Sequence, residues 1–125
     1  MNITGFNPQI ITKDAEAAIA TLEALGFART HNKTGDDDVV FSSVRMKDAN
    51  GFHVDVVKAE GVPFERDLTT IRINVDDFDA ARELLLSKGY RESKAFGEHE
   101  TPSSRYAYFV APSGHIIDVC QHLKE

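Results

Sequence analysis

The sequence repeats itself at a constant offset of 63 residues, and this repeat limits the possible folds more than any other feature. Six pairs of identical residues illustrate the offset, with no gap needed between them: Ile10 and Ile73, Asp14 and Asp77, Leu22 and Leu85, Gly26 and Gly89, Gly51 and Gly114, and Asp55 and Asp118. A chance similarity would not keep one register from the first predicted strand to the last. The chain of 125 residues therefore predicts a single domain built from two copies of one supersecondary unit.

Each copy predicts one strand, one helix and three further strands. The first strands, near 7–12 and 69–75, run into Asp14 and Asp77, whose carboxylates can accept the free amide hydrogens of a first helical turn. Gly26 and Gly89 stand where a left-handed residue commonly ends a helix. The other strands are expected near 27–32, 39–47, 53–59, 90–96, 104–110 and 115–122. This pattern predicts an α+β fold of two tandem βαβββ modules, about 1–60 and 68–125, joined by a linker of about 61–67.

Apolar residues indicate which face of each strand meets a helix. In the helices they recur at helical spacing, as Ala15, Ala18, Ile19 and Leu22, and as Phe78, Ala81, Leu84 and Leu85. In the strands, alternation directs one set toward the helices: Ile10, Val44, Met46, Val54, Val56, Ile71, Ile73, Val75, Ala107, Phe109, Ile117 and Val119.

The opposite face of the strands is polar. It is predicted to carry Asn7, Gln9, Arg45, His53, Asp55, Thr70, Arg72, Asn74, Tyr106, Tyr108, Asp118 and His122. Two interpretations fit this pattern, because a polar face can lie in solvent or can line a polar cup formed by a curved sheet. The second interpretation makes these residues candidates for binding a ligand.

Composition excludes several classes of function. A net charge of −6, with 14 scattered Lys and Arg, argues against nucleic-acid binding, which needs a basic surface. No apolar run approaches the length of a membrane span, and the first residues lack the basic and apolar segments of a signal peptide. Cys120 is the only cysteine, so no intramolecular disulfide can form, and we expect a cytoplasmic protein.

The motifs resemble the glyoxalase / bleomycin-resistance (vicinal oxygen chelate) superfamily. The resemblance rests on a strand that leads into an Asp, an Ala-rich helix that ends near a Gly, and a hairpin turn with Gly before a carboxylate. In this sequence the pieces are Asn7–Asp14, Leu25–Phe27 and Asp48–Asp55, then Thr70–Asp77, Lys88–Tyr90 and Ala111–Asp118. The resemblance implies a curved mixed sheet, a small-molecule ligand and a homodimer.

The resemblance also marks four positions at which metal-using members of the superfamily hold an ion. Those members place His or Gln on the first strand of a module and Glu on its last strand. The equivalent residues here are Asn7, Asp55, Thr70 and Asp118. Because zinc, nickel and iron prefer imidazole or thiolate ligands, we expect no transition metal. Two Asp and one Asn would suit Mg²⁺ or Ca²⁺ better, but too few ligands are identified for a dedicated site.

The ionisable candidates have alternative roles. If Asp55 and Asp118 lie close together, they can act as an acid/base pair, because repulsion between two negative charges raises the pKa of one of the two carboxyl groups. They are structural or ligand-orienting if Arg45 and Arg72 pair with them, which we favour. His53 is a base or a replacement metal ligand, or it forms only a hydrogen bond.

Other residues have simpler alternatives. Tyr106 and Tyr108 can stack on a flat ligand or merely suit a strand. Cys120 is a nucleophile only if its pKa is lowered, and buried packing is the commoner role. His99 is predicted on a polar loop, and the run Asp36–Asp38 is predicted to be a solvated loop.

These observations favour a homodimer that binds a small organic ligand without a catalytic metal. The alternative is a glyoxalase I-like lyase or isomerase that uses Asp55, Asp118 and His53, with a divalent metal. A third class, an interaction domain without a ligand, is disfavoured because such a module would not need so polar a sheet face.

Overall fold

The computed structural model describes residues 1–34, 41–59, 66–93, 98–100 and 104–123. The chain forms two compact units. Residues Asn7–Thr69 make the first unit, and Met1–Phe6 together with Thr70–Glu125 make the second unit. Residues 61–65 of the predicted linker and the predicted loop Asp36–Asp38 lie outside the described residues. Among the described residues, no helix is long and apolar enough to cross a membrane.

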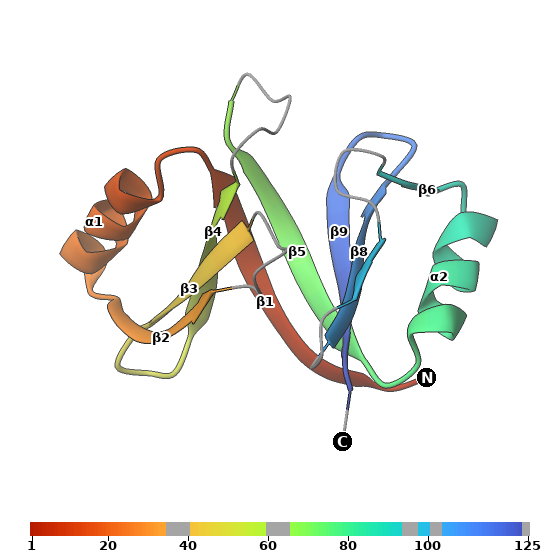
Figure 1. Ribbon diagram of the computed structural model, residues 1–125, viewed down its shortest axis with the longest axis horizontal. Helices are drawn as coiled ribbons and strands as arrows, with labels where there is room; N and C mark the ends of the chain where they lie inside the picture. Colours follow the sequence, from red (N-terminus) through yellow and green to blue (C-terminus); the bar gives the residue numbers. More distant parts are fainter. Residues whose placement is uncertain (35–40, 60–65, 94–97, 101–103, 124–125) are drawn as a thin grey trace. The chain divides into compact units, whose positions relative to one another are not determined.

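The first unit is a strand, a helix and three strands (Figure 1). Its strands pair in the order β2-β3-β4-β1, with β4 parallel to β1 and the other neighbours antiparallel. The elements are β1 (Ile3–Thr12, which enters this unit at Asn7), α1 (Ala15–Leu25), β2 (Ala28–Thr34), β3 (Phe41–Lys47) and β4 (His53–Ala59).

The second unit repeats this plan. Its strands pair in the order β5-β9-β8-β6, with β9 parallel to β5, and a further short strand, β7, also pairs with β8. The elements are β5 (Leu68–Val75, which enters this unit at Thr70), α2 (Phe78–Ser87), β6 (Arg91–Glu92), β7 (Glu98–Glu100), β8 (Ser104–Val110) and β9 (Ile116–His122). The predicted α+β fold of two βαβββ modules is therefore confirmed.

The two units also share one strand register at the repeat offset. Asp55 on β4 lies beside Gln9 on β1 and beside Arg45 on β3. At the equivalent positions, Asp118 on β9 lies beside Arg72 on β5 and beside Tyr108 on β8. The repeat in the sequence therefore corresponds to a repeat in strand pairing, residue by residue.

The helix ends form as the sequence predicts. Asp14 Oδ1 accepts a hydrogen bond from the Ala17 amide at 3.1 Å, and Asp77 Oδ1 accepts one from the Ala80 amide at 3.1 Å. Gly26 at the end of α1 has a φ of 118°, which is in the left-handed region that favours glycine.

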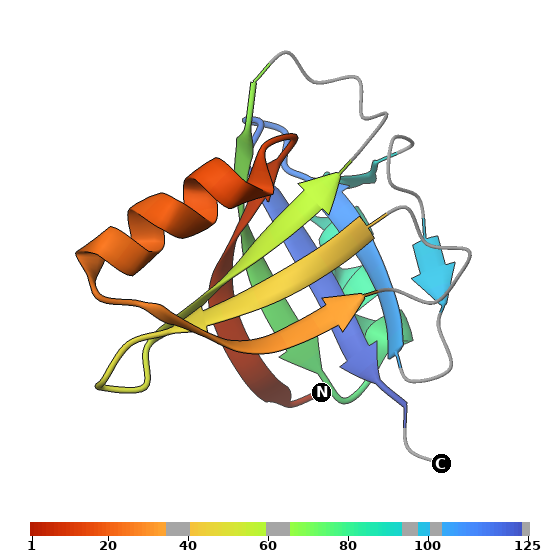
Figure 2. The ribbon, with the colours of Figure 1, turned by 60° about the vertical axis from the view of Figure 1, so that its left-hand side comes forward.

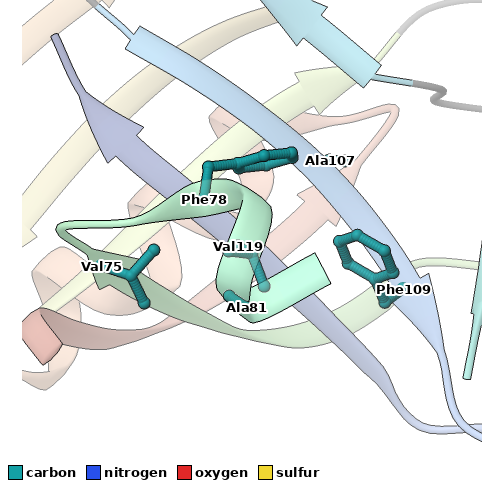
Figure 3. Close-up of a cluster of buried hydrophobic side chains, with 6 residues drawn as sticks. All are labelled: Val75, Phe78, Ala81, Ala107, Phe109 and Val119. Carbon is teal, nitrogen blue, oxygen red and sulfur yellow. The ribbon is translucent and has the colours of Figure 1, made fainter. Parts of the chain in front are cut away.

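Each unit buries one apolar cluster between its helix and its strands. In the first unit, α1 lies on one face of the strands (Figure 2), and the cluster contains Ala15, Ile19, Met46, Val54 and Val56. In the second unit, the cluster contains Val75, Phe78, Ala81, Ala107, Phe109 and Val119 (Figure 3). The alternation in the sequence identified all of these strand residues.

Some local predictions were wrong. Leu84 and Ile71 were assigned to the helix–sheet core, but they are 48% and 41% exposed, so they lie at its margin. The strand expected near 90–96 is present at Arg91–Glu92, and the Ser93 amide donates to the Tyr108 carbonyl. The rest of that prediction, at residues 94–96, lies outside the described residues. His99 was expected in a loop, but it lies in β7, where its backbone pairs with Tyr106 of β8. The first strand begins at Ile3 rather than near residue 7.

Candidate functional site

Part of the polar face of the strands is buried in each unit. Asn7, Gln9 and Asp55 in the first unit are at most 3% exposed. Thr70, Tyr108 and Asp118 in the second unit are also at most 3% exposed. These values favour a lined polar face over one that simply lies in solvent. Buried polar groups need partners, and these partners define the candidate site.

In the first unit, Arg45 and Asp55 form a bidentate ion pair. Arg45 Nε lies 2.9 Å from Asp55 Oδ1, and Arg45 Nη2 lies 3.2 Å from Asp55 Oδ2. Neighbouring positions in the antiparallel β3–β4 pair bring the two side chains together. This contact favours the interpretation in which Arg45 neutralises Asp55.

Asn7 holds the same carboxylate from the neighbouring strand β1. Its Nδ2 donates to Asp55 Oδ2 at 3.2 Å and to the Pro8 carbonyl at 2.8 Å. Both acceptors are oxygens, so the orientation of the amide is fixed by its hydrogen bonds. Asn7 Oδ1 is a buried acceptor to which no hydrogen bond is found within the described part of the chain. Asp55 is thus fixed from both neighbouring strands.

In the second unit, Arg72 is the centre of a different cluster. Its Nη2 donates to Cys120 Sγ at 3.2 Å, and its Nε lies 3.4 Å from Asn74 Oδ1. Gly5 makes room for Asn74, because a Cβ at Gly5 would lie 2.6 Å from Asn74 Nδ2. Gly5 was not among the residues predicted from the sequence, although a glycine inside a strand indicates the close approach of another group.

Two tyrosines lie on the same face as Arg72. The Tyr106 and Tyr108 rings meet edge to face, with centroids 6.3 Å apart. Burial, followed by the negative charge of Asp118, raises the pKa of Tyr106 to about 12 and the pKa of Tyr108 well above its ordinary value. Both phenols therefore keep their protons at neutral pH and can donate hydrogen bonds.

The two units thus place different side chains beside the equivalent carboxylates, Asp55 and Asp118. The guanidinium beside Asp55 comes from β3, whereas the guanidinium beside Asp118 comes from β5. At the position equivalent to Arg45 the second unit carries the buried Tyr108. The second unit therefore combines a guanidinium, two protonated phenols and a carboxylate.

The remaining candidates lie at the margins of these clusters. Gln9 is buried beside Asp55 in register, and Thr70 is buried near the start of β5. His53 opens β4 and is half-buried, and it lies about 6.6 Å along the strand from Asp55. His122 ends β9 and is exposed. The roles of all these residues stay predictions.

The four family ligand positions do not fit a transition metal. All four residues, Asn7, Asp55, Thr70 and Asp118, are buried, but they offer only oxygen and amide groups. Both oxygens of Asp55 already accept hydrogen bonds from Arg45, so a cation there would compete with a guanidinium. Among the described residues, no three His, Cys, Asp or Glu side chains gather closely enough to hold an ion.

No protein-family model matches the sequence, and no curated protein sequence matches it. Solved structures do match. Methylmalonyl-CoA epimerase from Mycobacterium tuberculosis is 18% identical, with a TM-score of 0.67 over 98% of this chain and 90% of that chain. A variant of methylmalonyl-CoA epimerase from Streptomyces coelicolor, in complex with 2-nitronate-propionyl-CoA, is 15% identical. Its TM-score is 0.66, and the match covers 98% of this chain and 100% of that chain.

A variant of glyoxalase I from Zea mays is 12% identical, with a TM-score of 0.67. The match covers 98% of this chain but only 44% of that chain. Identities this low establish the fold alone. The resemblance found in the sequence is confirmed at that level: this chain has the vicinal oxygen chelate fold, which methylmalonyl-CoA epimerase and glyoxalase I share.

Proposed function

We propose that the protein binds a small organic ligand with an anionic group on the polar face of its strands, without a catalytic transition metal. The observation that carries this proposal is the cluster around Arg72 in the second unit. Arg72 is a permanent cation with several planar donors, and such a group suits carboxylate or phosphate oxygens. Tyr106 and Tyr108 add hydroxyl donors that stay protonated at neutral pH.

Replacing Arg72 by Ala tests the proposal. If Arg72 binds an anionic group, the variant should bind about 2 kcal/mol more weakly, which is the scale for losing a charge-assisted hydrogen bond. Propionyl-CoA is a suitable first probe in calorimetry, because a structural neighbour was solved with a propionyl-CoA derivative. Arg29→Ala is the matched control, since Arg29 pairs with the exposed Glu16.

The sign of the Arg72→Ala effect separates two roles. If Arg72 only neutralises Asp118, a cationic ligand should bind the variant as well or better, while the protein loses stability. Unchanged affinity and unchanged stability together would contradict the assignment of Arg72 to the buried polar face.

A metal-dependent lyase or isomerase is the second candidate, favoured by the enzymes among the structural neighbours. It would use Asp55, Asp118 and His53. We expect elemental analysis of the purified protein to find no stoichiometric Zn, Ni or Fe, because the ligand positions supply no imidazole or thiolate. About one transition-metal ion per chain, lost on Asp118→Ala, would put the enzyme first and make His53 the next residue to test.

We also propose a homodimer, because sheet edges need to be covered and proteins of the superfamily commonly pair. Sedimentation equilibrium at micromolar concentration should give about twice the chain mass of 13.9 kDa. A constant mass of one chain at all concentrations would contradict this. A cytoplasmic location, expected from the single cysteine, stays a prediction.

A further inference from the structure

Arg45 is a fixed cation on the polar face of the first unit. Within the described residues, the side-chain bonds of its guanidinium all go to Asp55, through Nε and Nη2. Asp55 is itself fixed by Asn7, which is tied in turn to the Pro8 carbonyl. The Arg45 side chain remains 39% exposed, whereas that of Asp55 is 2% exposed. The carboxylate is thus the buried partner of the pair, and the Arg45 side chain is the more accessible one.

The remaining nitrogen of this guanidinium, Nη1, faces away from Asp55. The three nitrogens of a guanidinium radiate from one carbon in a plane, so a carboxylate bound at Nε and Nη2 leaves the donors of Nη1 on the other side. These donors have fixed directions because the side chain is held at two atoms. A ligand oxygen that binds there therefore meets a preorganised, permanently charged group.

The resemblance of the sequence to the superfamily implies that Asp55 stands where its metal-using members place a carboxylate ligand. We propose that Arg45 takes the place of that cation, and that its Nη1 binds an anionic carboxylate or phosphate oxygen of the ligand. Asp55 and Asn7 are then positioning residues, which hold Arg45 rather than the ligand. This inference rests on the proposed function, because it assumes that the ligand binds on the polar face.

Side-chain NMR of the arginine Nε–Hε groups tests the inference in the intact protein. The probes are sodium acetate, inorganic phosphate and propionyl-CoA, each added to the wild-type chain at neutral pH. We expect at least one probe to shift the Arg45 resonance in a saturable way, and Arg45→Gln to weaken binding of that probe about tenfold or more. Arg45→Lys keeps the charge without the planar fork, and it should retain part of the affinity.

Arg29→Gln is the control, because Arg29 is also 39% exposed and also pairs with a carboxylate, but on an exposed surface. Its resonance should not shift in a saturable way, and its replacement should leave probe binding unchanged. Addition of Mn²⁺ alone provides a second measurement. If Arg45 already occupies the cation's place, millimolar Mn²⁺ should not selectively broaden the resonances of residues 54–56.

The outcomes separate this inference from the proposed function. If the probes shift Arg72 but not Arg45, the inference is wrong and the proposed function stands. If no probe shifts either arginine, both are wrong. Tight Mn²⁺ binding at Asp55 in the wild-type protein would also overturn the inference. The NMR titrations and the Mn²⁺ addition use the wild-type chain, so these outcomes can be measured even if Arg45→Gln fails to fold.

Discussion

Arg45→Gln should lower the free energy of unfolding by about 3 kcal/mol or more, whereas Asp55→Asn should cost about half as much. The two sides of this ion pair differ in exposure: the Arg45 side chain is 39% exposed, and that of Asp55 is 2% exposed. Without Arg45, a carboxylate would stay buried without its counter-ion. Without the Asp55 charge, the guanidinium can still turn toward water, and the asparagine keeps a similar shape.

Urea unfolding at neutral pH measures both changes. The control is Arg29→Gln, which removes an exposed ion pair with Glu16 and should cost less than about 1 kcal/mol. High salt should abolish the small effect of the control but should weaken the Arg45 effect only slightly, because buried pairs are poorly screened. Equal losses in the free energy of unfolding for Arg45→Gln and Arg29→Gln would mean that Arg45 does not neutralise Asp55 in solution.

The fold could be predicted because local signals and the repeat agree. Asp14 and Asp77 cap their helices as expected, and the strand alternation correctly separates the apolar core from the polar face. Agreement between capping, periodicity and turn residues is what specifies a single fold. The repeat then extends each local prediction to an equivalent position in the other half of the chain.

The errors in the fold prediction fall where long-range packing overrides a local pattern. Leu84 has helical spacing with Leu85, but its place on α2 leaves it 48% exposed. The backbone of His99 pairs with Tyr106, a contact that polar composition does not reveal. Strand pairing of short polar segments depends on their neighbours more than on their own residues.

The candidate site could be predicted as a face but not as a set of contacts. The sequence identified Arg45, Arg72 and both Asp residues, and it favoured their pairing. It did not indicate which guanidinium would lie beside which carboxylate. Cross-strand register decides this, because a side chain reaches only its direct and diagonal neighbours. The contact between Arg72 and Cys120 was missed for the same reason.

Phe109→Ala should be among the most destabilising single changes in the second unit, with a loss of about 3–5 kcal/mol in the free energy of unfolding. The Phe109 side chain is fully buried among Phe78, Ala81 and Val119 (Figure 3). Truncation removes most of an aromatic ring from this cluster. The strands and the helix that surround the ring can close the resulting cavity only in part, so the loss includes a cavity cost in addition to the lost transfer energy.

Two further variants make the measurement specific. Met46 lies at the equivalent position of the first unit and is also fully buried, so Met46→Ala should cost about 2–5 kcal/mol. Leu84→Ala is the control. Because Leu84 is 48% exposed, its replacement should lower the free energy of unfolding by less than about 1 kcal/mol. Urea unfolding followed by far-UV circular dichroism gives all three values. If Leu84→Ala cost as much as Phe109→Ala, α2 would pack on the strands through a different side from the one that contains Phe78 and Ala81.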